Sequence, residues 1–411
     1  MIYQEYKKTI FSNGLTVISE FMPAVRSISL GVWIKTGTRF EPKNHNGVAH
    51  FLEHMMFKGT RRRSPRQIVR SIESLGGQMN AFTGKEQTCY HVEILDEHLP
   101  RAVEVLADIM LNSTFPEKEF EKERRVILDE IQSLEDTPDE MVHDFFVEKL
   151  FPDHGLGYPI LGTPETVAAL GREGMLEFYR TYYRAREIII AATGNVNHQQ
   201  LIDLAGKYFR FPEANGVIPI PRPPVFHGGE FRVERPIHQV HLCTGVSAYP
   251  FAHPRKFNLL VLNTILGGGM SSRLFQNIRE RHGIAYGIYS FFDFYIDEGI
   301  LGVYLGTDKR NLGKALKLVE REFQQLRKKP VSARELEEAK SQLKGNLVLG
   351  LESTAARMNR LAMMEIYLGN FQSIDTVVED IERVTPESLW ETAQELLDEN
   401  RFLRVIFLPK N

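Results

Sequence analysis

The sequence predicts an α+β fold of two homologous domains, each a mostly antiparallel β-sheet with helices packed on one face. Three observations support this fold: chain length, alternation of strand and helix patterns, and repetition of that pattern in both halves. The 411 residues exceed one ordinary hydrophobic core and suffice for two domains of about 200 residues each. Strand-like runs alternate with amphipathic helices without a Gly-x-Gly-x-x-Gly opening, which favours an α+β sheet.

The two halves repeat the same order of elements. A helix opens at Ser64–Ile68 in the first half and at Ser271–Phe275 in the second, and each runs to a glycine, Gly76 or Gly283. Duplication of a unit of roughly 200 residues is the simplest explanation. Other matched pairs are Arg101–Val103 with Lys314–Leu316, Ser133–Thr137 with Gly350–Thr354, and the β-rich runs Ile188–Ala192 and Leu403–Phe407.

A proline-rich segment separates the halves. Proline disrupts helices and central strands, so this segment is predicted to be an extended linker. We predict a first domain over residues 1–211, a linker over 212–230 and a second domain over 231–411. The five prolines are Pro212, Pro219, Pro221, Pro223 and Pro224.

Composition excludes several classes of protein. Lys and Arg total 50 against 53 Asp and Glu, so a general nucleic-acid binder is not expected. No apolar run reaches the 18 residues that cross a bilayer, and the start lacks the features of a signal or transit peptide. We therefore expect a cytoplasmic protein with no membrane partner. Cys89 and Cys243 lie in apolar, strand-like runs and are expected to be reduced core residues.

The segment His50-Phe51-Leu52-Glu53-His54 carries the chemistry. It lies within a predicted helix over Asn46–Phe57, where residues four apart share a face, so His50 and His54 can bind one ion. Glu53 lies on the flank of that face, close to the metal without binding it. This arrangement is the inverted form of the zinc-peptidase motif.

Zinc in a catalytic site needs a third protein ligand and an open position for water. A charged helix is predicted over Pro116–Leu134, and Glu123 and Glu130 point the same way on it, two turns apart. We assign Glu130 as the third ligand, and Glu123 as a residue that orients a ligating histidine through its free ring N–H.

Each signal has a less specific explanation. Two satisfied surface histidines on an amphipathic helix would also give the pentapeptide, and Glu123 and Glu130 alone would fit a solvated face. The metal site is therefore predicted from the combination. The sequence Gly267-Gly268-Gly269 lacks the Gly-Lys-Ser/Thr ending of a nucleotide loop, so no ATP dependence is expected. Four other histidines lack a second ligand at metal spacing and are expected to be structural or solvated: His91, His98, His143 and His154.

Motifs along nearly the whole chain resemble the pitrilysin-type inverzincin family, in particular bacterial processing-type peptidases similar to the catalytic (beta) subunit of mitochondrial processing peptidase. The His54–Glu130 separation, 75 intervening residues, is close to that of the family. The motifs are Asn13–Val17, Gly37–Arg39, His50–Thr60, Asn80–Thr83, Glu86–Thr88, Arg125–Ile131, Gly267–Leu274, and the pair Arg279 and Tyr286.

The resemblance implies a zinc-dependent endopeptidase in which Zn²⁺ is bound by the two histidines and Glu130, and Glu53 is the general base. It implies that Asn80, Ala81 and Phe82 lie on an edge strand to which peptide substrates add as a further strand. Arg279 and Tyr286 resemble the pair that contacts the substrate backbone and supports the oxyanion. Without the family match, they would be a surface arginine and a core tyrosine.

The second half lacks a metal site of its own. Its counterpart of the zinc helix reads Phe257–Val261 without histidine, and Glu130 aligns with Asn346 or Leu347. Four such units enclose a chamber in the family, so a homodimer is expected, with Arg279 and Tyr286 supplied by the partner chain. Two alternatives to an active homodimer are an obligate heteromer and an inactive scaffold subunit. For an active enzyme, the substrates are either short or unfolded peptides that it degrades or leader peptides that it trims from precursors.

Overall fold

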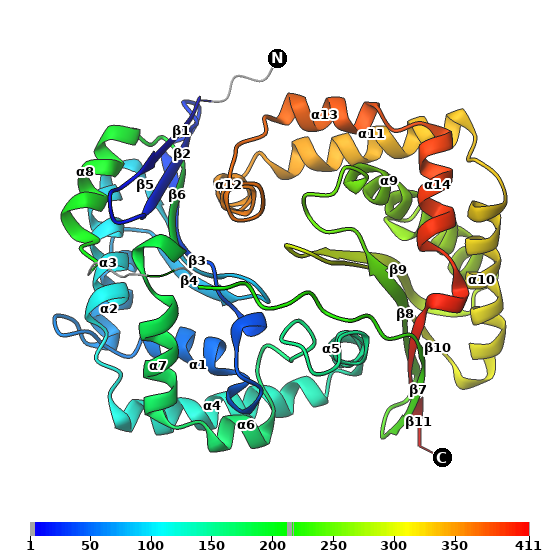
Figure 1. The fold of residues 1–411 in the computed structure, drawn as a ribbon, viewed down its shortest axis with the longest axis horizontal. Coiled ribbons are helices and arrows are strands. Elements are labelled where there is room, and N and C mark those ends of the chain that lie inside the picture. Colours follow the sequence, from blue (N-terminus) through cyan, green and yellow to red (C-terminus); the bar gives the residue numbers. More distant parts are fainter. Residues whose placement is uncertain (1–4, 212–215, 217, 411) are drawn as a thin grey trace. The chain divides into compact units, whose positions relative to one another are not determined.

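The computed structural model describes residues 5–211, 216 and 218–410 and contains two β-sheets, each with its own helices (Figure 1). The first sheet has six strands in the order β1-β2-β6-β3-β5-β4. Only the β2–β6 pair is parallel. β1 and β4 are therefore the two edge strands. The bounds are β1 (Glu5–Ile10), β2 (Thr16–Phe21), β3 (Ser27–Ile34), β4 (Gln78–Thr83), β5 (Thr88–Leu95) and β6 (Ile188–Gly194).

The second sheet has five strands in the order β7-β11-β8-β10-β9, and only the β7–β11 pair is parallel. Each sheet is thus mostly antiparallel, and the predicted fold class is confirmed. The strands are β7 (Gly229–Arg235), β8 (Val240–Ala248), β9 (Ala285–Phe294), β10 (Gly299–Thr307) and β11 (Leu403–Pro409).

Helices grouped with the first sheet are α1 (Val48–Met56), α2 (Pro65–Glu73), α3 (Leu99–Asn112), most of α4 (Glu117–Glu135), α6 (Pro164–Ala169), α7 (Arg172–Tyr182), α8 (His198–Tyr208) and α12 (Thr354–Leu368). Those grouped with the second are α5 (Pro138–Leu150), α9 (Lys256–Gly267), α10 (Leu312–Lys328), nearly all of α11 (Ala333–Gly350), α13 (Ile374–Glu382) and α14 (Pro386–Leu396), with a short π-helix at Phe275–Glu280.

Both faces of each sheet are buried along its central strands, such as β3 and β6 in the first sheet and β8 and β10 in the second. In the first, Val32 and Ile190 belong to the large core under α1 and α3, whereas their neighbours Trp33 and Ile189 pack with residues of α12. This alternation follows from the two-residue period of a strand. The second sheet repeats it, with α5 on the face that carries Val405 and Phe407. Helices thus cover the second face of each sheet too, which the sequence did not lead us to expect.

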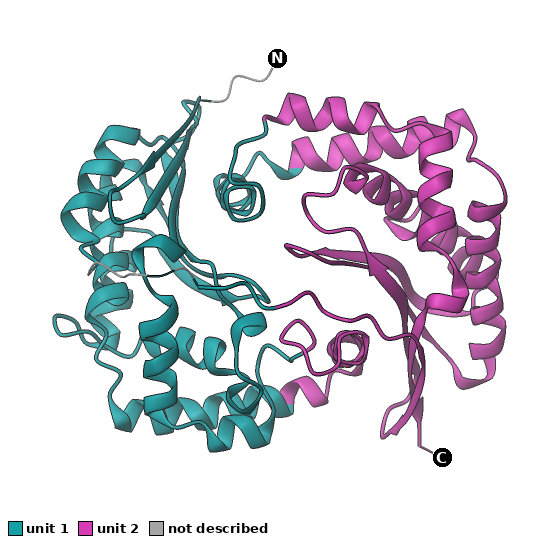
Figure 2. Ribbon diagram, viewed as in Figure 1, with its two compact units in different colours: residues 1–132, 158–221, 350–372 teal, residues 133–157, 222–349, 373–411 magenta. Residues whose placement is uncertain are grey.

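Each of the two compact units includes one segment from the half of the sequence that forms most of the other unit (Figure 2). One unit comprises residues 1–132, 158–221 and 350–372, and the other comprises 133–157, 222–349 and 373–411. The predicted continuous domains, 1–211 and 231–411, differ from these units because α5 packs on the second sheet and α12 on the first. The segments that contain α5 and α12 begin at residues 133 and 350, the positions matched in the sequence repeat.

Several smaller expectations are answered. Cys89 and Cys243 are free and buried. Residues 216 and 218–228 of the predicted linker have neither helix nor strand, while β7 begins at Gly229; residues 212–215 and 217 lie outside the described part. Among the described residues, no helix combines the length and apolar character needed to cross a membrane.

Candidate metal centre

Helix α1 carries the His-x-x-Glu-His motif and is fixed by its apolar side and its N-terminus. Val48, Phe51, Leu52, Met55 and Met56 are fully buried, at the spacing of one helix face. The helix is two residues shorter at the start than predicted, because Gly47 adopts a left-handed conformation with φ of 94°. His50, Glu53 and His54 are therefore held on a helix that is anchored in the core.

A buried carboxylate caps the start of α1. Glu41 Oε2 accepts hydrogen bonds from Asn46 Nδ2 and Gly47 N, both at 2.8 Å, and its Oε1 accepts one from Ala49 N at 2.7 Å. These donors include backbone amides that a helix N-terminus leaves without an intrahelical partner. A negatively charged carboxylate there also interacts favourably with the positive end of the helix dipole. Burial raises the pKa of Glu41 to about 7, although these hydrogen bonds oppose the shift.

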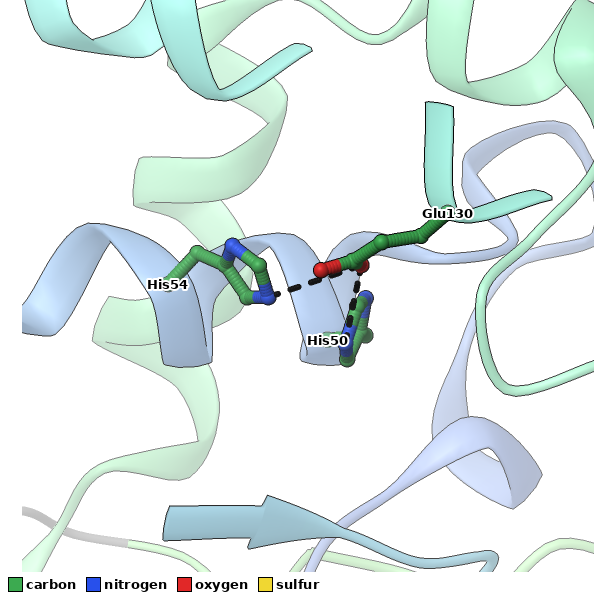
Figure 3. Close-up of side chains that lie close together, drawn as sticks. All are labelled: His50, His54 and Glu130. Carbon is green, nitrogen blue, oxygen red and sulfur yellow. Dashed lines mark ion pairs between the residues drawn. The ribbon is translucent and has the colours of Figure 1, made fainter. Parts of the chain in front are cut away.

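The three predicted ligands lie together (Figure 3). Glu130 Oε2 is 3.9 Å from His50 Nε2 and 3.7 Å from His54 Nε2, and all three ligand atoms lie within 4.8 Å of one another. Atoms bound tetrahedrally to one zinc ion at about 2.1 Å are roughly 3.4 Å apart, close to these separations. No other group of three His, Cys, Asp or Glu residues with this closeness occurs in the described residues.

The donor set fits zinc in two further respects. Glu130 Oε2 is buried without a hydrogen-bond partner, an arrangement that a cation between the three side chains would resolve. Burial, together with the nearby His54, lowers the pKa of His50 to about 3. Its imidazole is therefore neutral at physiological pH, which is the form that binds metal.

Glu123 lies behind His54, away from the ligand atoms. Its Oε2 is 3.1 Å from His54 Nδ1 and its Oε1 is 2.8 Å from Lys58 Nζ, and only 2% of the residue is exposed. A carboxylate can only accept, so Nδ1 carries the proton and Nε2 keeps its lone pair toward Glu130. The structure thus brings Glu123 to a histidine in the way the sequence predicted.

Glu53 also lies near this centre, in a partly enclosed position. Its side chain is on α1 beside His54, and its Oε2 accepts a hydrogen bond of 2.5 Å from Thr83 Oγ1. Burial raises the pKa of Glu53, whereas the Thr83 hydrogen bond and His54 lower it. A carboxylate beside the three clustered ligand candidates is a group that can accept and donate protons during catalysis.

Asn80, Ala81 and Phe82 lie on β4, an edge strand as predicted. Among the described residues β4 pairs with β5 alone, so its outer edge has backbone groups available to an added strand. Phe82 packs edge-on against Trp33 with ring centroids 5.4 Å apart, and the Asn80 side chain accepts from the amide of Ala81.

Arg279 and Tyr286 lie in the other unit and are exposed. Arg279 is on the π-helix, with its guanidinium 4.9 Å from the centroid of the Phe275 ring. Tyr286 is 54% exposed on the edge strand β9 and donates a 3.3 Å hydrogen bond to Asp308. Tyr286 is thus not a core residue.

The remaining sequence predictions are also placed. His143 stacks against the Tyr304 ring and forms a hydrogen bond with the Tyr289 hydroxyl. His154 forms a hydrogen bond with the backbone carbonyl of Arg222. Neither these two nor His91 and His98 belong to the metal cluster found among the described residues. The sequence did not identify Glu41, Lys58 or Thr83 as neighbours of the site. Lys58 offered one signal, since it follows His54 by one helical turn.

Known proteins resemble the chain over nearly its whole length. The family model "Insulinase (Peptidase family M16)" matches residues 16–164, and "Peptidase M16 inactive domain" matches residues 169–343. "Uncharacterized zinc protease YmxG" of Bacillus subtilis is 40% identical over 97% of this chain and 98% of its own. The chain belongs to peptidase family M16. A further relative of this M16 protein, named an uncharacterized zinc protease of Streptomyces coelicolor, is 38% identical over 97% of this chain and 89% of its own.

Solved structures show the same M16 fold. A protease from Helicobacter pylori matches with a TM-score of 0.91 at 22% identity, over 99% of this chain and 100% of its own. A peptidase M16 inactive domain from Pseudomonas fluorescens matches with a TM-score of 0.91 at 20% identity, over 99% and 98%. The first M16 family model spans all the ligand candidates, and the model named inactive covers the part whose described residues have no metal cluster.

Proposed function

We propose that the chain is a zinc-dependent endopeptidase, with zinc bound by His50, His54 and Glu130 and with Glu53 as general base. The main observation in support is that the side chains of His50, His54 and Glu130 converge beside a second, partly enclosed carboxylate, that of Glu53. The zinc-protease names of two relatives, 40% and 38% identical, support the choice of metal and reaction.

Each residue has a defined task in this reaction. Zinc bound here would polarise the peptide carbonyl and acidify a water molecule. Glu53 accepts the proton of the attacking water at its carboxylate and delivers it to the nitrogen of the leaving amine. Glu123 keeps His54 in the Nδ1–H tautomer through the whole cycle, because its own position is fixed by burial and by Lys58.

The edge strand β4 is the proposed binding site for the substrate backbone. An extended peptide that pairs with Asn80, Ala81 and Phe82 would form main-chain hydrogen bonds, which carry little sequence preference. The hydrogen bond between Thr83, the last residue of β4, and Glu53 links this strand to the base. Substrates of this kind are short or unfolded peptides, since a folded protein has few free strands to donate.

We further propose that Arg279 and Tyr286 contact the substrate from a partner copy of this chain in a homodimer. Both side chains are exposed, and the described part of their own unit has no metal cluster. An Arg and a Tyr side chain can donate hydrogen bonds to the oxyanion that develops during attack on the carbonyl. The alternative substrate of this chain is the leader peptide of a precursor protein, as its resemblance to the beta subunit of mitochondrial processing peptidase implies. The same residues would catalyse that cleavage.

Cleavage of a quenched fluorescent peptide library by purified protein tests the function. Activity should disappear with a chelator, return with zinc, and be absent in Glu53→Gln, which should still bind zinc. Stoichiometric zinc with no cleavage of any library peptide would favour the inactive scaffold or an obligate heteromer.

A further inference from the structure

Thr83 occupies a special place at the end of the edge strand. It is the last residue of β4 and lies opposite Thr88 of β5. Side chains alternate along a strand, so Thr83 faces the same side as Met79 and Ala81, which pack against the core that contains α1. This side of β4 brings its hydroxyl to Glu53, 2.5 Å from Oε2.

The Thr83 hydroxyl is the one hydrogen-bond donor to the Glu53 carboxylate among the described residues. A threonine is stiff about χ1, so its oxygen has a well-defined position once the strand is fixed. Oε2 is therefore occupied by a fixed donor, whereas Oε1 has no hydrogen-bond partner in the part of the chain that the structure describes and is available to water. The bond selects one orientation of a side chain that otherwise has three rotatable bonds.

We propose that Thr83 is a positioning residue, which holds Glu53 in the orientation that accepts the proton of the attacking water and couples that orientation to the substrate-binding strand. The inference rests on the proposed endopeptidase function. A peptide that pairs with β4 stabilises the strand that carries Thr83, so binding of substrate also fixes the base. Positioning of this kind raises kcat with little effect on KM.

The substitution Thr83→Val tests the proposal, because valine keeps the β-branched shape and lacks the hydroxyl. We expect kcat about tenfold lower with KM within about twofold of wild type, since a hydrogen bond to a charged group is lost. Thr83→Ser should restore kcat to within about twofold. Thr88→Val is a matched control: it faces the same side, but its hydroxyl bonds the carbonyl of Thr36. Its kcat should equal that of wild type.

A second measurement does not depend on activity. Crystal structures of the zinc-loaded proteins should show one Glu53 conformer in wild type and Thr83→Ser, and more than one in Thr83→Val. Wild-type kcat in Thr83→Val, a single unchanged Glu53 conformer, or loss of zinc in proportion to kcat would each overturn the proposal. Failure of the endopeptidase function would look different, because wild type itself would then cleave no peptide.

Discussion

His54 bonds Glu123 through Nδ1 at 3.1 Å while Nε2 of the same ring lies 3.7 Å from Glu130 Oε2. One imidazole therefore contacts two carboxylates on the same side of α4, the buried Glu123 and the ligand candidate Glu130. Glu123 and Glu130 are two turns apart on that helix, so the geometry of the ligand and the geometry of its support are set by one element.

Removal of the charge at Glu123 should weaken zinc binding. Glu123→Gln keeps the size of the side chain, but its amide is a weaker acceptor for the His54 ring, so we expect zinc affinity about 10- to 100-fold lower. Competition with a chromophoric chelator measures this affinity. Glu121→Gln, on the same helix but paired with Arg124, is the control and should bind zinc as wild type does. Equal affinity in both variants would contradict the role of Glu123.

Glu130→Gln should lose zinc more completely. A neutral amide is a poor zinc ligand, and two histidines alone leave the ion without its third protein ligand. We expect the zinc content after dialysis to fall from one per chain to well below one, measured by inductively coupled plasma mass spectrometry. Asp129→Asn removes the neighbouring carboxylate and should keep one zinc. A stoichiometric zinc in Glu130→Gln would exclude Glu130 as a ligand.

The buried Glu41 should make stability depend on pH. Burial raises its folded-state pKa from 4.5 to about 7, so the native chain binds this proton more tightly than the unfolded chain. The stabilisation is complete below pH 4.5 and is lost as pH rises through 7. The unfolding free energy of wild type relative to Glu41→Gln should therefore fall by about 3 kcal/mol across this range.

Urea unfolding at a series of pH values, with chelator present, measures this difference. Other carboxyl groups with raised pKa, such as Glu187 and Glu322, contribute equally to both proteins and cancel. Parallel stability curves from pH 4.5 to 8 would show that Glu41 does not titrate in this range.

A composite site can be tested by mixing inactive chains. If Tyr286 acts on the metal centre of a partner, Glu53→Gln and Tyr286→Phe chains should regain activity in mixed dimers, because one of the two sites is then intact. We expect about half of wild-type activity in isolated mixed dimers and about a quarter in an equal, unfractionated mixture. Differently tagged chains allow mixed dimers to be isolated and assayed. No recovery in isolated mixed dimers would exclude this arrangement, and Glu53→Gln mixed with Glu130→Gln is the control that should stay inactive.

The spacing of residues in the sequence predicted the helices that carry the metal cluster, but not the residues that contact this cluster from loops and strands. The apolar spacing around His50 located α1 to within two residues, and the seven-residue spacing placed Glu123 and Glu130 on one side of α4. Glu41 and Thr83 were missed because their contacts with α1 depend on loops and on strand pairing, which no helical or strand period encodes. The covering of β6 by α12 was missed for the same reason, since more than 150 residues separate them.

The reciprocal placement of α5 and α12 has a consequence for how the chain acquires its structure during synthesis. The first sheet leaves Trp33, Cys89 and Ile189 uncovered until residues 354–368 have been made, more than 150 residues after β6. A fragment cut at the proline-rich segment would therefore expose this apolar face and tend to aggregate. Each sheet thus depends on a helix from the other half of the chain to cover its second face, α12 for the first sheet and α5 for the second.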